Sequence, residues 1–221
     1  MFLIKICGIT NPIDALAVIQ SGADAVGLNF YTASPRFIDH STARRICSVL
    51  PPEIVKVGLF VNAAANDISR TFDELDLDLI QLHGDETPDF IAQLGDRPVM
   101  RAFHLGQEGL QPIFDYLDRC KQLKCVPKLV MFDALVKGVH GGSGETANWS
   151  ICAEYPRDEG FPPLVLAGGL KPSNVAEAIK HVRPAAVDTA SGVESSPGKK
   201  DPAAVNAFVQ AARKAFAANS V

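Results

Sequence analysis

The sequence predicts a single (βα)8 barrel domain that spans residues 1–221. Short apolar runs alternate with helical patterns from one end of the chain to the other, and eight such runs can be counted. A doubly wound sheet commonly has about five or six strands, so a count of eight favours a closed barrel. The length agrees, because barrels of this kind have about 200–250 residues as one unit.

The predicted strands are apolar at successive positions rather than at alternate ones, which is typical of a parallel sheet that is buried on both faces. We expect them near residues 3–7, 24–28, 54–61, 78–82, 98–102, 128–133, 163–167 and 184–188. No linker, low-complexity segment or charge run interrupts the repeat. Nothing in the sequence therefore divides the chain into two domains.

Capping residues place helices between these strands. Asn11, Thr87 and Asp201 each precede a proline, which marks the first turn of a helix, and Gly22 marks the end of the first helix. The fifth and last helices each keep one face apolar, so both should pack on the barrel. These faces hold Leu110, Ile113, Phe114 and Leu117 in the fifth helix, and Val205, Phe208, Val209, Ala212 and Phe216 in the last.

Composition excludes several classes of function. The net charge is −4 and no block of lysine and arginine occurs, so neither a nucleic acid nor a membrane surface is an expected partner. No apolar run approaches the roughly 18 residues of a membrane span, and the N-terminal segment does not have the form of a signal peptide. The five cysteines include no Cys-x-x-Cys pair, which indicates reduced thiols in a cytoplasmic protein.

Barrel chemistry occurs at the carboxyl ends of the strands, where polar residues gather in this chain. Cys7 ends the first predicted strand and Asp133 ends the sixth, which lies across the barrel mouth. A base and an acid can therefore flank one ligand, provided that positive potential near Cys7 favours its thiolate. Free cysteine is more often a buried core residue, and this interpretation of Cys7 stays open. The other expected strand-end residues are Gly8, Asn29, Val61, Asn62, Gln81, Leu82, His83, Gly84, Arg101, Ala102, Gly168, Gly169 and residues 188–192.

Two glycine loops predict a phosphate site. Gly168 and Gly169 follow the seventh strand, and Ser191 and Gly192 follow the eighth. Many barrels hold a phosphate in these two loops, because glycine lets backbone N–H groups approach an anion. We also expect Pro172 to open the seventh helix, whose N-terminus would add positive potential. Either glycine pair alone could instead form a tight turn.

Three side chains are candidate substrate contacts. Arg36 follows the second strand, and its planar guanidinium suits a carboxylate, although a loop arginine is more often solvated. His83 is either a ligand contact or a hydrogen-bonded histidine of the barrel mouth, and Asp188 ends the eighth strand. The glycine-dense segment 137–146 is either a mobile lid or slack chain. No group of His, Cys and Asp has metal-ligand spacing, so no metal is expected.

These motifs resemble those of the phosphoribosylanthranilate isomerases, enzymes of tryptophan biosynthesis. The resemblance begins with Lys5-Ile6-Cys7-Gly8-Ile9-Thr10 and follows the family's order over nearly the whole chain. The other matching stretches are residues 22–27, 34–36, 58–62, 81–84, 141–144, 167–170, 187–188, 191–194 and 197–201. The short motifs at residues 147–149 and 190–192 differ from those usual in the family, which puts loop closure and phosphate affinity in doubt.

The resemblance implies an Amadori rearrangement with no metal and no organic cofactor. N-(5-phosphoribosyl)anthranilate becomes the aminoketose 1-(2-carboxyphenylamino)-1-deoxyribulose 5-phosphate. By similarity, Asp133 is the general acid that protonates the ribose ring oxygen, and Cys7 is the general base that removes the C2 proton. Arg36 would bind the anthranilate carboxylate, and the two glycine loops would bind the phosphate. The expected partner is this small phosphorylated aminosugar, and the chain is expected to be a monomer or a homodimer.

Two alternatives stay open. The related aminoaldose isomerase of histidine biosynthesis has a similar barrel but works with two aspartates, and Cys7 argues against it. The second alternative is a non-catalytic barrel that binds a phosphorylated ligand. Both candidate proton-transfer residues are intact, which argues against a protein that has lost turnover, although a fold alone does not prove activity.

Overall fold

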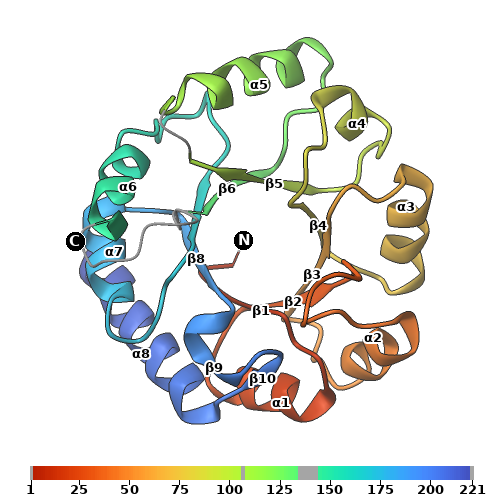
Figure 1. The fold of residues 1–221 in the computed structure, drawn as a ribbon, viewed down its shortest axis with the longest axis vertical. Helices are drawn as coiled ribbons and strands as arrows, with labels where there is room; N and C mark the ends of the chain where they lie inside the picture. Colours follow the sequence, from red (N-terminus) through yellow and green to blue (C-terminus); the bar gives the residue numbers. More distant parts are fainter. Residues whose placement is uncertain (1, 106–107, 134–143, 220–221) are drawn as a thin grey trace.

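Eight parallel strands close into a barrel that helices surround, as seen in the computed structural model (Figure 1). The structure describes residues 2–105, 108–133 and 144–219. The strands follow one another around the barrel in chain order, and the first pairs with the eighth. They are β1 (Ile4–Cys7), β2 (Ala25–Asn29), β3 (Val55–Phe60), β4 (Leu79–Leu82), β5 (Val99–His104), β6 (Leu129–Asp133), β7 (Leu164–Ala167) and β8 (Ala186–Thr189). The predicted (βα)8 barrel is confirmed.

A helix follows each barrel strand. The helices are α1 (Pro12–Gln20), α2 (His40–Cys47), α3 (Ala65–Glu74), α4 (Pro88–Ala92), α5 (Gln111–Gln122), α6 (Gly144–Ala153), α7 (Val175–Val182) and α8 (Pro202–Asn219). The predicted caps are present, because Asn11, Thr87 and Asp201 accept backbone N–H groups at the starts of α1, α4 and α8. Within the described ranges, no helix combines the length and apolar character that crossing a membrane requires.

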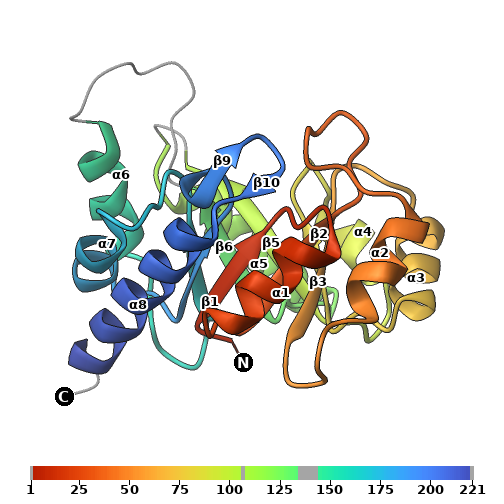
Figure 2. The ribbon, with the colours of Figure 1, turned by 90° about the horizontal axis from the view of Figure 1, so that it is seen from below.

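Strand alternation decides which side chains enter the barrel. Ile4 and Ile6 pack among the residues between β1 and the helices, so Lys5 and Cys7 face the interior. Below them, small and branched apolar side chains of the strands fill the inside together with Phe2. The N-terminus accordingly lies near the barrel axis in Figure 1, and Figure 2 shows it on the face opposite β9 (Glu194–Ser196) and β10 (Lys199–Lys200).

Three features differ from the sequence-based predictions. Strand β5 continues to His104, so Arg101 and Ala102 lie inside the strand and His104 is the residue at its end. Helix α7 begins at Val175, and Pro172 lies in the turn before it rather than in its first turn. The chain after β8 forms a short 3-10 helix, η1 (Ser191–Val193), and the β9–β10 hairpin, neither of which was predicted. The glycine-dense segment, residues 137–146, for which a lid and slack chain were both left open, lies mostly outside the described residues.

Candidate active site

A cavity of about 240 Å³ opens at the carboxyl ends of the strands and collects nearly all of the predicted site residues. Eight of the nine line it: Cys7, Arg36, His83, Asp133, Gly168, Gly169, Asp188 and Ser191. The ninth, Gly192, packs behind the wall, where an added Cβ would collide with the carbonyl of Leu170. The candidate base and the candidate acid therefore share one cavity, contributed by β1 and β6.

Cys7 sits at the base of the cavity with only 5% of its surface exposed. Gly27 on β2 makes room for it, because a Cβ at that position would lie 2.6 Å from Sγ. Burial raises the pKa of the thiol, and the positive charges of Lys5 and Lys200 oppose this rise without cancelling it. The positive potential expected beside Cys7 is present, but burial outweighs it, so the pKa of the thiol lies above its ordinary value.

Lys5 is a site residue that the sequence analysis missed. It is fully buried one layer below Cys7, and its Nζ donates to Oδ1 of Asp188 at 2.8 Å. Burial lowers the pKa of Lys5, but Asp188 and Cys7 outweigh burial and hold the pKa above its ordinary value. The ammonium therefore stays charged beneath the thiol. Its position two residues before Cys7 was a usable signal, since such residues share one face of a strand.

Arg36 is held over the cavity by Glu194. Its Nε and Nη2 donate to the two carboxylate oxygens at 2.8 and 2.6 Å, and Glu194 also accepts from Lys200 Nζ at 2.7 Å. Gly8, with φ of +76°, lies under the aliphatic part of Arg36, where a Cβ would collide with it. One edge of the guanidinium is thus used to fix its orientation. Nη1 makes no hydrogen bond to the residues that the structure describes, so it is available to a ligand in the cavity.

The two glycine loops are braced against each other. Thr189 donates from Oγ1 to the carbonyl of Leu170 at 2.6 Å, which ties β8 to the loop after β7. In that loop Gly168 and Gly169 both have positive φ, and Asn174 donates to the carbonyl of Gly169 at 3.1 Å. The backbone N–H groups of Gly168 and Gly169 do not take part in helical hydrogen bonds, since α7 starts only at Val175.

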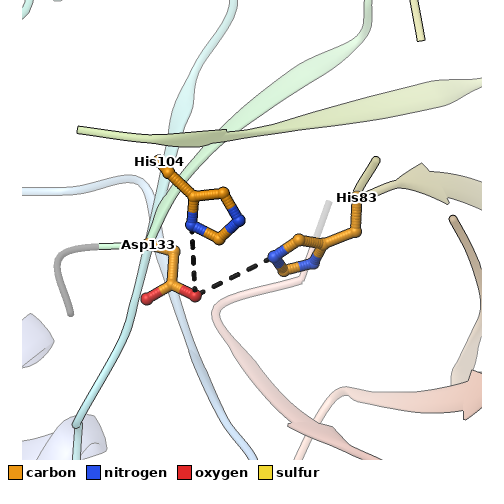
Figure 3. A group of neighbouring side chains, drawn as sticks. All are labelled: His83, His104 and Asp133. Atoms are coloured by element: carbon orange, nitrogen blue, oxygen red, sulfur yellow. Dashed lines mark ion pairs between the residues drawn. The ribbon is translucent and has the colours of Figure 1, made fainter. Parts of the chain in front are cut away.

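Asp133 lies between two histidines at the mouth (Figure 3). Its Oδ2 is 3.8 Å from Nε2 of His83 and 3.8 Å from Nδ1 of His104. Gln81 contacts the other ring nitrogen of His83 at 2.9 Å. His104 escaped the sequence analysis because the end of β5 was placed two residues too early.

A family model and curated relatives point to the same family. A family model described as N-(5'phosphoribosyl)anthranilate (PRA) isomerase matches residues 4–211. A protein of Trichlorobacter lovleyi named N-(5'-phosphoribosyl)anthranilate isomerase is 46% identical over 217 residues, which cover 98% of this chain and 100% of that protein. The chain belongs to the N-(5'-phosphoribosyl)anthranilate isomerase family. The resemblance inferred from the motifs is thereby confirmed.

Solved structures of phosphoribosyl anthranilate isomerases share this barrel. The Thermotoga maritima enzyme matches with a TM-score of 0.82 and 40% identity, covering 97% of this chain and 100% of that one. A phosphoribosyl anthranilate isomerase in complex with reduced 1-(o-carboxyphenylamino)-1-deoxyribulose 5-phosphate matches with a TM-score of 0.78 and 38% identity, at the same coverage. That isomerase binds a molecule with a carboxylate at one end and a phosphate at the other.

Proposed function

We propose that this chain is an isomerase of tryptophan biosynthesis that converts N-(5'-phosphoribosyl)anthranilate into 1-(2-carboxyphenylamino)-1-deoxyribulose 5-phosphate. Family membership supports the reaction. The observation that supports the mechanism is the shared cavity, whose lining includes a thiol, a carboxyl group, an arginine and residues of two glycine loops. These groups suit a substrate that has a reacting sugar, a carboxylate and a phosphate.

The reaction needs one acid and one base. Asp133 donates its proton to the ring oxygen, the C1–O bond breaks, and the anthranilate nitrogen shares its lone pair with C1 to give a protonated Schiff base. The thiolate of Cys7 then removes the C2 proton, and the C–H electrons form a C1–C2 double bond that neutralises the nitrogen. The resulting enolamine loses its hydroxyl proton and gains a proton at C1, which gives the ketone. Carbon 1 is reduced and carbon 2 is oxidised, so the redox balance is internal to the substrate.

The protonated Schiff base is expected to lower the raised pKa of the Cys7 thiol. Its positive charge forms next to C2, the atom from which Cys7 must take a proton, and a nearby cation favours the thiolate. The buried ammonium of Lys5 adds to this from below. The thiolate is therefore stabilised most when the ring has opened and the C2 proton has become acidic.

Lys5→Met is expected to raise the pKa of Cys7 further, because the positive charge of Lys5 opposes the rise that burial causes. The rate of Cys7 alkylation as a function of pH measures this, after subtracting the rate of a Cys7→Ser variant. Lys56→Met is the matched control, since Lys56 also pairs with an aspartate at 2.8 Å but lies on β3, outside the cavity that Cys7 lines. Equal alkylation midpoints for Lys5→Met and wild type would show that the ammonium does not act on the thiol.

Arg36→Ala is expected to raise KM by about 10- to 100-fold with a smaller effect on kcat, because it removes charge-assisted hydrogen bonds of about 1.5–3 kcal/mol to the substrate carboxylate. Glu194→Gln should raise KM less, since it only loosens the guanidinium. Arg44→Ala on α2 is the control for losing an arginine. Steady-state kinetics separate the two parameters, and a fall in kcat at unchanged KM would assign Arg36 to the chemical steps instead.

His83 and Asp188 are proposed as further substrate contacts, and Gly168, Gly169, Ser191 and Gly192 as the phosphate site. Asp188 lines the cavity and also accepts from Nζ of Lys5, while Gly192 lies behind the lining and sets the spacing of the two loops. The proposal covers residues 1–221 as one domain.

The decisive test of the activity follows the fluorescence of N-(5-phosphoribosyl)anthranilate after addition of the purified protein. Loss of the signal is expected with catalytic amounts of protein. A stable signal together with saturable binding of the substrate would favour the non-catalytic barrel. Turnover of the corresponding aminoaldose of histidine biosynthesis would instead favour the second isomerase, against which the thiol at position 7 argues.

The protein is proposed to act in the cytoplasm, as a monomer or a homodimer. All five cysteines are free thiols in the structure, which suits a reducing compartment. One solved relative is described as a monomeric form of a dimeric isomerase of Thermotoga maritima. Sedimentation of the purified chain distinguishes the two states.

A further inference from the structure

The histidine pair beside Asp133 forms a group that the isomerase reaction does not need in full. His83 follows β4, His104 ends β5 and Asp133 ends β6, so three neighbouring strands each deliver one side chain to the same point of the mouth (Figure 3). We propose that His83, His104 and Asp133 form a binding site for a divalent transition metal ion such as Zn²⁺, and that the bound ion inhibits the enzyme.

The geometry fits such an ion after small movements. One ligand atom from each residue lies within 4.8 Å of the other two, and Oδ2 of Asp133 is 3.8 Å from a nitrogen of each histidine. An ion in the plane of the three atoms and at equal distance from them would then lie no more than roughly 2.5 Å from each, against about 2.0–2.2 Å in zinc sites. Closing this gap needs shifts of a few tenths of an ångström, and the side chain of His104 is 61% exposed.

The ligand set defines the class of ion. Two imidazoles and one carboxylate suit zinc, nickel, cobalt or iron, whereas calcium and magnesium prefer oxygen ligands. Three protein ligands at a solvent-facing mouth leave further positions for water. The net charge of the chain is −4, so its overall field does not repel a cation.

Gln81 supplies the outer partner that metal-bound histidines usually have. It is fully buried, and its amide faces Nδ1 of His83 at 2.9 Å, which leaves Nε2 directed at Asp133. Its Oε1 has no hydrogen-bond partner among the described residues. Rotating the amide would let Oε1 accept from Nδ1–H, and this tautomer of His83 presents the lone pair of Nε2 to an ion.

Inhibition follows from the position of the ion. A carboxylate that ligates a metal cannot carry the proton that ring opening requires, and the ion would stand where the sugar must approach Asp133. This consequence rests on the proposed role of Asp133, whereas binding of the ion does not. The two parts therefore have separate measurements.

Binding is tested on the metal-free full chain by titration with Co²⁺, whose visible absorption reports nitrogen and oxygen ligands, and by displacement with Zn²⁺. We expect one ion per chain and an affinity that His104→Ala lowers by about tenfold or more, because one of three protein ligands is lost. His40→Ala is the matched control, since His40 also lies beside a carboxylate, at 3.5 Å from Glu74. Cys7→Ser should leave the Co²⁺ affinity unchanged.

Three outcomes would overturn the site: no saturable Co²⁺ spectrum, equal affinities of His104→Ala and wild type, or loss of binding in Cys7→Ser, which would place the ion on the thiol. Inhibition is tested separately, by adding Zn²⁺ to the fluorescence assay and then removing it with a chelator. Reversible inhibition that His104→Ala weakens is expected. Binding of the ion without inhibition would keep the metal site but contradict the role of Asp133 as the acid.

Discussion

Cys7→Ala is expected to lower kcat by about 10²- to 10⁴-fold, because a positioned general base contributes a factor of this size. Asp188 on the neighbouring strand β8 also lines the cavity, but its carboxylate is paired with the ammonium of Lys5, which makes it a poor substitute for the thiolate. KM should change little, since the thiol is small and binds neither anion of the substrate. The measurement is the rate of fluorescence loss at saturating substrate.

Three companion variants make the Cys7 result specific. Cys120→Ala removes another fully buried thiol, on α5, and should leave kcat unchanged. Cys7→Ser keeps the size but not the basicity and should resemble Cys7→Ala. Cys7→Asp restores a base and should recover part of the rate. Full turnover by Cys7→Ala would refute the mechanism while leaving the activity intact.

Asp133→Asn is the second change with a large expected effect, again about 10²- to 10⁴-fold in kcat. The amide has nearly the same shape as the carboxyl group, so binding of the substrate should persist, but it cannot act as an acid toward the ring oxygen. Asp115→Asn, on the exposed face of α5, is the control for the chemical change. Comparable kcat values for Asp133→Asn and wild type would remove Asp133 from the mechanism.

Cys7 and Asp133 could be identified from the sequence because each of them ends a predicted strand. Cys7 and Asp133 close apolar runs, and the closed barrel places the ends of β1 and β6 on one cavity. The two glycine loops could be identified for the same reason, since each follows a predicted strand. Strand number and strand order thus determine most of the site, since they fix where the carboxyl ends meet.

Residues whose role depends on where the side chain points in the folded protein could not be predicted from the sequence. His104 was missed because the predicted strand ends at residue 102, whereas the hydrogen-bonded ladder of β5 and β6 continues to His104. The partnership of Arg36 with Glu194 joins residues 158 positions apart, through a hairpin that no local pattern predicted. The direction of the Cys7 pKa shift depends on burial against nearby charges, and neither quantity is visible in a linear sequence.

The assignment of Cys7 as the base and Asp133 as the acid is tested most directly with substrate deuterated at C2. In Cys7→Ser, removal of the C2 proton becomes the slow step, so kcat should show a primary isotope effect. In Asp133→Asn, ring opening becomes the slow step and breaks no bond to deuterium. The ratio of kcat for unlabelled substrate to kcat for deuterated substrate should therefore stay near unity. The reverse pattern, or the same ratio in both variants, would contradict the assignment of Cys7 as the base and Asp133 as the acid.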